Sequence, residues 1–150
     1  MDRRIKRPGP LRSAPANPWR TVLVIGAGGF AGGLARYGIG VAWPTTPGGF
    51  PWATFTVNTS GAFALAFLLV VALEMLPPSP YLRPALGTGF CGAYTTFSTV
   101  TVASDQLAGH GHAALALAYL GASILAGLAA TLLGLAIGRT VASSRPVANS

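Results

Sequence analysis

Four long apolar segments joined by short turns constrain this chain more than any other feature of its sequence. The segments cover about residues 22–43, 52–76, 81–104 and 113–138. Each is long enough to cross the hydrocarbon core of a bilayer, which takes about 20 residues. Proline and glycine fill the connections, and tryptophan and tyrosine stand at segment ends, where interfacial aromatic belts form. The pattern predicts an all-α membrane protein with four transmembrane helices.

The composition agrees with a membrane protein and excludes several other classes. Hydrophobic residues make up 51% of the chain and charged residues only 9%, whereas soluble domains carry about 25% charged residues. With three acidic residues, two histidines and one cysteine, the chain cannot form a disulfide scaffold. It also lacks a set of nucleophile, base and acid for catalysis, so we expect that it is not an enzyme.

The ten Lys and Arg residues are distributed very unevenly. Six lie within residues 1–20, a basic and proline-rich segment that we expect to be a disordered tail. Residues 21–139 are then the four-span domain, and 140–150 a short C-terminal tail. Apart from Arg36, nine basic residues fall on the termini or, for Arg83, at the start of the third segment beside the second loop, and none falls in the other two loops. The positive-inside rule therefore predicts a plasma-membrane protein with both termini in the cytoplasm, and the net charge of +7 marks orientation rather than nucleic-acid binding.

Two polar residues inside the spans are candidate functional residues. Arg36 follows Gly29 and Gly32 at helical spacing, so it shares their face and is predicted to point into protein. An arginine within a span is a functional candidate, although snorkelling to the interface is the alternative. Asn58 in the second span must find hydrogen-bond partners, either in a functional site or as contacts between helices.

The third segment reads GTGFCGAYTTFSTVT over residues 87–101, and nine of these fifteen residues are Gly, Ser or Thr. Because glycine and β-branched residues weaken a helix, we predict a break near Gly92–Thr95. Unwound backbone at membrane depth lines a cavity or is buried in protein, and its carbonyls can hold cations. Hydroxyls and aromatic ring edges can in turn face an anion. A packing face of small residues is the alternative.

The fourth segment places Tyr119, Ser123 and Gly127 four residues apart on one face. Their side chains either donate hydrogen bonds into a pore or form a packing stripe, and the spacing alone leaves both open. His110 and His112 lie in a loop without acidic or cysteine companions, so we interpret them as loop residues rather than metal ligands.

Three motifs occur in order along the four spans: GGLARY (32–37), TFTVNTSGAF (54–63) and GFCGAYTTFSTV (89–100). Over about residues 26–138 the chain resembles the CrcB/Fluc family of fluoride channels. The resemblance implies a fluoride-selective channel that lowers cytoplasmic fluoride by passive flow. It also implies an antiparallel dimer of four-helix subunits in which the broken third helices cross around a structural sodium ion (Na+).

The resemblance also assigns roles to individual residues. The backbone carbonyls of Gly92 and Thr95 correspond to the sodium ligands, and Arg36 to the arginine of the first helix. The fluoride pore is implied to be lined by Asn58, Thr96, Phe97, Ser98, Thr99, Tyr119 and Ser123.

The chain departs from the family pattern at two positions. Val100 stands where the family has the second phenylalanine of an aromatic pair, and Ala103 replaces an acid. Valine has no ring edge to offer an anion, so a pore lined by Val100 is expected to be weak or closed. The subunits of an antiparallel homodimer must also insert into the membrane in both directions. A chain with nine basic residues on one predicted side of the membrane and none on the other should insert in one direction only. We therefore expect a heterodimer with a second CrcB-like subunit of reversed loop charge, surrounded by membrane lipid.

Two other functions are considered. A small four-span multidrug exporter needs a carboxylate within the membrane, whereas the first span carries Arg36 and no acid. A non-conducting structural subunit that supports an active partner is the second alternative. A conductance assay of Phe97→Ile and Asn58→Asp separates a conducting channel from a structural subunit, because a structural subunit would tolerate both substitutions.

Overall fold

The computed structural model describes residues 17–74 and 79–144, and all regular structure in these ranges is helical. Its elements are α1 (Pro18–Ala42), α2 (Trp52–Glu74), the π-helix η1 (Pro84–Cys91), α3 (Gly92–Tyr94), α4 (Ser98–Gly109) and α5 (Ala113–Ser143). The predicted basic tail up to residue 16 lies outside the described residues, as do residues 75–78 and 145–150.

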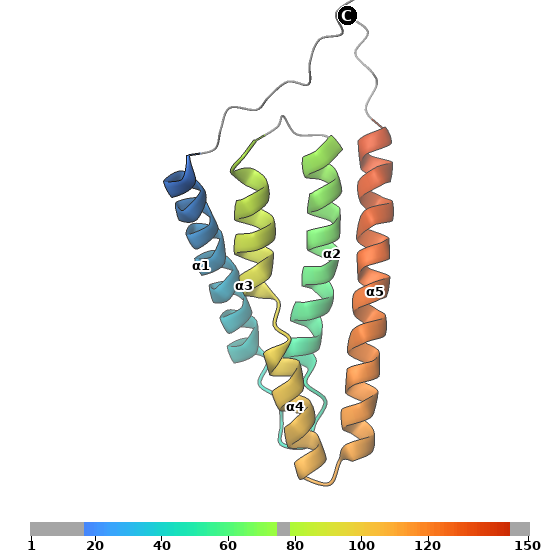
Figure 1. Ribbon diagram of the computed structural model, residues 1–150. Helices are drawn as coiled ribbons and strands as arrows, with labels where there is room; N and C mark the ends of the chain where they lie inside the picture. Colours follow the sequence, from blue (N-terminus) through green and yellow to red (C-terminus); the bar gives the residue numbers. More distant parts are fainter. Residues whose placement is uncertain (1–16, 75–78, 145–150) are drawn as a thin grey trace, which may run out of the picture.

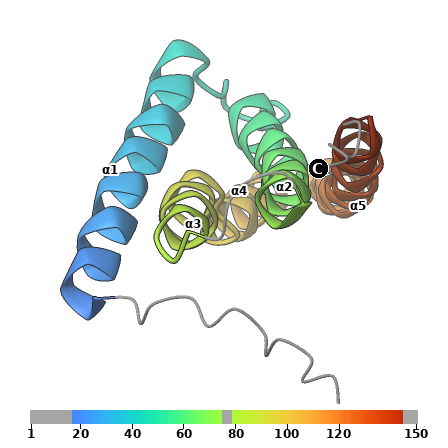
Figure 2. The same ribbon diagram turned by 90° about the horizontal axis from the view of Figure 1, so that it is seen from above.

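The helices lie side by side as an elongated bundle (Figure 1). One end, which we call the tail end, holds the start of α1, the end of α2, the start of η1 and the end of α5. The opposite end, the hairpin end, holds the α1–α2 loop and the turn between α4 and α5. Seen from above, α1 lies apart from α5, with η1, α3 and α2 between them (Figure 2).

The ends of α1 follow from its sequence. Asn17 caps its start, because Asn17 Oδ1 accepts a hydrogen bond from the Trp19 N–H at 3.1 Å. Pro18 occupies the first turn, where a missing N–H costs nothing. The helix stops at Ala42, two residues before Pro44, whose ring disfavours helical backbone at the residue before it.

Small residues let the helices approach closely, as is typical in membranes. A side chain at Gly28 would fall on the carbonyl oxygen of Ala85, and one at Gly32 on that of Phe90, so α1 packs against the backbone of η1. On the other side, Gly134 of α5 packs against the α2 backbone, 2.5 Å separating an added Cβ from the Phe63 carbonyl. Gly33, by contrast, has open space around it.

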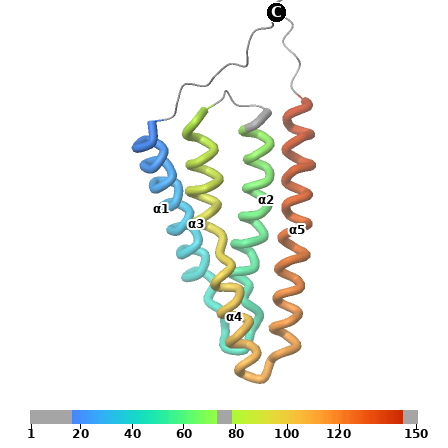
Figure 3. The backbone as a smooth tube through the Cα atoms, in the orientation of Figure 1, coloured from blue at the N-terminus to red at the C-terminus, as the bar shows by residue number. Residues whose placement is uncertain are grey.

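The predicted four-span architecture is confirmed, with one span divided. Three helices are long and apolar enough to cross a membrane: α1, the Trp52–Ala72 part of α2, and α5. The third passage is η1, α3 and α4 in succession, with a bend that the tube in Figure 3 shows clearly. The irregular residues are 95–97, slightly later than predicted, because the glycines at 87 and 89 lie within the π-helix instead of interrupting it.

Candidate ion pathway around the broken third helix

The break in the third passage is held by one side chain of α2. Asn58 Nδ2 donates a hydrogen bond to the Thr96 carbonyl at 2.8 Å, and Asn58 Oδ1 accepts one from the Thr96 N–H at 2.8 Å. Thr95 is extended, with φ −80° and ψ 156°, so the chain leaves the helix there. The amide therefore replaces the two helical hydrogen bonds that Thr96 loses, as an unwound residue at membrane depth requires.

This arrangement frees two particular carbonyls. In a continuous helix the Thr96 N–H would bond the carbonyl of Gly92, but here it bonds Asn58. The Thr99 N–H would bond the carbonyl of Thr95, but it donates to Thr96 Oγ1 at 3.2 Å. Gly92 and Thr95 thus present backbone oxygens without their usual helical donors.

A group of hydroxyls gathers where α4 begins. Thr96 Oγ1 lies 3.2 Å from Ser98 Oγ and 3.0 Å from Thr99 Oγ1, and it also caps the start of α4. Phe97 lies between them in sequence, and its ring is 81% exposed on the surface of the subunit. The break therefore presents both hydroxyls and an aromatic ring to the outside of a single chain.

One groove runs along the exposed side of this break. It has a volume of about 430 Å³ and a mainly apolar lining, and we call it the Phe97 groove. Its lining residues are Asn58, Thr95, Thr96, Phe97, Val100, Leu120, Ser123 and Ile124. Val100 is buried at its floor, 5% exposed, and the Ser123 hydroxyl is buried without a hydrogen-bond partner among the described residues.

A second cavity, of about 330 Å³, lies on the other side of the break and holds Arg36. We call it the Arg36 vestibule, and Thr54, Thr96, Ser98 and Thr99 share its lining. Arg36 is exposed in the subunit, which corrects the prediction that it points into protein. The reason is the break itself: α1 packs on η1 and α3 but not on α4, so the hairpin-end part of α1 has no neighbour on that side.

Tyr119 of α5 is the most completely buried large side chain, with 0% exposure. Its hydroxyl makes no hydrogen bond of acceptable geometry to a described residue, although Thr54 and Ser123 present hydroxyls toward it. Thr54 belongs to the Arg36 vestibule and Ser123 to the Phe97 groove. Tyr119 thus lies between the two cavities, whereas Gly127, which shares its predicted stripe, has open space around it.

Sequence reasoning did not single out Phe50 of the α1–α2 loop, which contacts the Tyr119 ring at a centroid distance of 5.2 Å. A lone phenylalanine between glycines and a proline gives no periodic signal, so only the folded loop could have revealed it. The histidines behave as loop residues: His112 packs beside Gly48, and the Nδ1 of His110 lies 2.6 Å from the Gln106 carbonyl.

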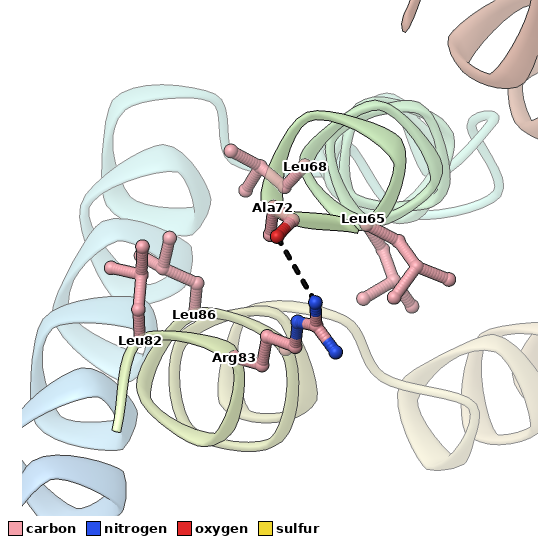
Figure 4. A pocket seen from close by; sticks show the side chains of 8 residues that line it. Leu65, Leu68, Ala72, Leu82, Arg83 and Leu86 are labelled. Carbon is pink, nitrogen blue, oxygen red and sulfur yellow. Dashed lines mark hydrogen bonds between the residues drawn. The ribbon is translucent and has the colours of Figure 1, made fainter. Parts of the chain in front are cut away.

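A third, apolar pocket lies at the tail end between α2 and η1 (Figure 4). Leucines line most of it, and the Arg83 guanidinium donates to the Ala72 carbonyl at 3.2 Å. A cation at the C-terminal end of a helix is favourable, so Arg83 stabilises the end of α2. Within residues 17–74 and 79–144 no group of three or more His, Cys, Asp or Glu side chains could hold a metal ion.

Comparison with known proteins agrees with the predicted family. Residues 23–135 match the family model described as CrcB-like protein, Camphor Resistance (CrcB). A Streptomyces avermitilis protein named fluoride-specific ion channel FluC 3 is 54% identical over 81% of this chain, which spans 59% of that relative's length. FluC 2 of the same organism is 42% identical over 80% of this chain and 76% of its own length. FluC 1 of Streptomyces coelicolor is 44% identical over 85% of this chain and 86% of its own length.

The matched range includes all the helices around the break, from α1 to most of α5. The long apolar helices and the broken passage are those of a multi-pass membrane protein. This chain belongs to the CrcB (FluC) family of membrane ion channels.

Proposed function

We propose that the protein is a fluoride-selective channel that lets fluoride leave the cytoplasm passively. The observation that carries the proposal is the Asn58 clamp on Thr96, because it holds neutral donors and a ring edge together at an unwound point of the membrane span. The relatives' shared name, fluoride-specific ion channel, supports the choice of anion.

The donors around the break suit a small, strongly hydrated anion. The Asn58 amide carries two N–H groups, and only one of them is used on Thr96. The positive edge of the Phe97 ring lies in the same groove as Asn58, and the hydroxyls of Ser98 and Thr99 line the Arg36 vestibule on the other side of the break. On each side these groups can replace part of the water shell of fluoride. Arg36 in its vestibule raises the local concentration of anions at one mouth.

The proposal includes a second subunit in antiparallel orientation. Unwound backbone cannot face lipid, yet the Phe97 groove with Asn58 and Thr96 is open on one side of the chain. A partner that covers this groove would complete the pore and bury Phe97. The two breaks would then face each other across the dimer axis.

The carbonyls of Gly92 and Thr95 fit a structural sodium ion at that axis. Both lack their helical N–H donors because Asn58 and Thr96 Oγ1 take those donors. Carbonyl oxygens are hard ligands that suit such a cation. The ion would neutralise the partial negative charge of four carbonyls, two from each subunit, and would not be transported.

We further propose that the partner is a different chain. Arg20 lies in the first turn of α1, Arg83 precedes η1 and Arg139 lies near the end of α5. These helix ends form the tail end of the bundle. The three residues belong to the nine basic residues that the sequence places at the termini and beside the second loop. Such a bias favours one orientation with both termini in the cytoplasm, whereas an antiparallel dimer needs one subunit of each orientation. Streptomyces avermitilis has at least two FluC proteins, which is consistent with paired genes.

The experiment is fluoride efflux from loaded vesicles that hold this chain together with its antiparallel partner, with this chain native or carrying Phe97→Ile or Asn58→Asp. Loss of efflux in both variants, with chloride efflux low throughout, supports conduction by this chain. Native-like efflux in both variants contradicts it and favours a structural subunit. A rate that depends on a proton gradient contradicts passive flow and favours an exporter.

A further inference from the structure

The Tyr119 hydroxyl is buried, with the Thr54 and Ser123 hydroxyls directed toward it. The side chain is 0% exposed, and its oxygen has no hydrogen-bond partner among the described residues. The Ser123 hydroxyl, one helical turn along α5, is also buried and unpartnered. Buried polar groups are normally satisfied. We call these two hydroxyls the hydroxyl column, since Ser123 lines the Phe97 groove and Tyr119 lies one turn closer to the hairpin end of α5.

Phe50 closes the column at the hairpin end. Its ring meets that of Tyr119 in an edge arrangement, with centroids 5.2 Å apart and planes at 86°. Two further aromatic rings neighbour Phe50: Trp52 at 4.4 Å and Phe55 at 5.5 Å between centroids. Among these aromatic neighbours, Phe50 is the one whose ring contacts Tyr119.

The backbone of the α1–α2 loop brings Phe50 to this position. The Gly49 N–H donates to the Thr46 carbonyl at 2.9 Å, and the Trp52 N–H donates to the Phe50 carbonyl at 2.9 Å. Gly48 has a positive φ of 71°, which glycine adopts without strain, and lies against the His112 ring. The loop is thus tied to both the start of α2 and the turn before α5.

We propose that Phe50 is a positioning residue for anion selectivity. It holds the Tyr119 ring with its hydroxyl inside the protein and keeps water out of the column from the hairpin end. A hydrogen-bond donor that is shielded from water interacts more strongly with an anion than a hydrated donor does. Such a donor therefore stabilises an anion that has lost its water shell. This inference rests on the proposed conduction of fluoride, because it concerns discrimination against a larger anion such as chloride.

The test compares Phe50→Ala with the matched control Phe55→Ala. Both remove one phenylalanine ring from the same aromatic cluster, and of the two it is Phe50 whose ring packs edge-on against that of Tyr119. The first measurement is hydroxyl-radical footprinting of Tyr119 by mass spectrometry in purified, lipid-reconstituted protein. The second is the ratio of fluoride to chloride efflux from vesicles that hold the conducting channel. Phe50→Leu, which keeps an apolar side chain over Tyr119, serves as the conservative variant.

We expect Phe50→Ala to raise the modification rate of Tyr119 about tenfold or more, because a protected group reacts only through local opening. The ratio of fluoride to chloride efflux falls about tenfold in Phe50→Ala. In Phe55→Ala this ratio stays within about twofold of the native value. In Phe50→Leu the ratio lies nearer to the native value than it does in Phe50→Ala. Equal footprints and equal ratios for Phe50→Ala and Phe55→Ala overturn the proposal. If the native channel, assembled with its partner chain, passes no fluoride at all, the proposed function fails, whereas the footprint still decides whether Phe50 seals Tyr119.

Discussion

The side-chain amide of Asn58 bonds both backbone groups of Thr96, each at 2.8 Å, across 38 positions of sequence. Through this pair α2 holds the third passage open at its break. The same pair diverts the Thr96 N–H from Gly92 and leaves one amide N–H of Asn58 free. One side chain therefore supports the irregular backbone and remains available to an anion.

Replacing Asn58 with Asp should abolish fluoride efflux and destabilise the protein. Aspartate keeps the acceptor for the Thr96 N–H but loses the donor to the Thr96 carbonyl, and its charge repels an anion. Leaving the half-buried Thr96 carbonyl without its donor costs up to about 1–3 kcal/mol, the range for a fully buried group, and thermal unfolding in detergent can measure this loss. Thr59→Val is the control, since the Thr59 hydroxyl is buried without a partner and its loss should not destabilise the protein. Equal unfolding temperatures for the Asn58→Asp and Thr59→Val variants would contradict the clamp.

A methyl group at Gly32 should disturb the contact between α1 and η1. An added Cβ would overlap the carbonyl of Phe90, and overpacking of this kind costs about 1–3 kcal/mol. Gly33→Ala, one residue further on, meets open space and should keep or raise stability, because alanine favours a helix over glycine by up to about 1 kcal/mol. Guanidinium or thermal unfolding of the two variants compares them directly, and a larger loss of stability at Gly33 would refute this packing.

Replacing Tyr119 with Phe should separate conduction from stability. The native hydroxyl is buried and unpartnered, and such a group costs about 1–3 kcal/mol, so its removal should leave stability equal or higher. Fluoride efflux should nevertheless fall, because the column loses a donor. A Tyr119→Phe protein that is clearly less stable would show that the hydroxyl is a structural partner instead.

Replacing Arg36 with Gln should slow fluoride efflux mainly at low ionic strength. Arg36 faces the vestibule and is exposed, so its effect on anions is electrostatic and screened by salt. At about 0.01 M salt, where the Debye length is about 30 Å, we expect a fall of about tenfold, and at about 1 M the difference should largely disappear. Arg36→Lys keeps the charge and should stay near native. A deficit that is independent of salt would point to a packing role.

The architecture could be predicted from sequence because membranes impose simple lengths and periodicities. Apolar runs identified the spans, and glycine-rich stretches indicated where helices approach, as at Gly28 and Gly32. The break was predicted close to its position, but propensity alone could not locate it. The hydrogen bonds of Asn58 decide that Thr96, rather than a nearby glycine, leaves the helix.

Other features depend on tertiary arrangement. Arg36 was predicted to be covered, because helical spacing says which residues share a face but not where a neighbouring helix bends away. The contact between Phe50 and Tyr119 joins a loop to the fourth span, and nothing in the local sequence of either indicates it. Helical spacing placed Tyr119, Ser123 and Gly127 on one stripe of the fourth span. The structure shows that the Tyr119 and Ser123 hydroxyls are buried, whereas Gly127 has open space around it.

The most direct test of the account is fluoride efflux from vesicles prepared from cell membranes without detergent, so that the cell sets the orientation of each subunit. This chain is expressed alone, and then together with a family member whose Lys and Arg residues lie at its hairpin end. The account predicts little fluoride efflux from the chain alone and rapid efflux, selective over chloride, from the pair. Rapid selective efflux from the chain alone would contradict the heterodimer, and no efflux from either preparation would contradict the channel.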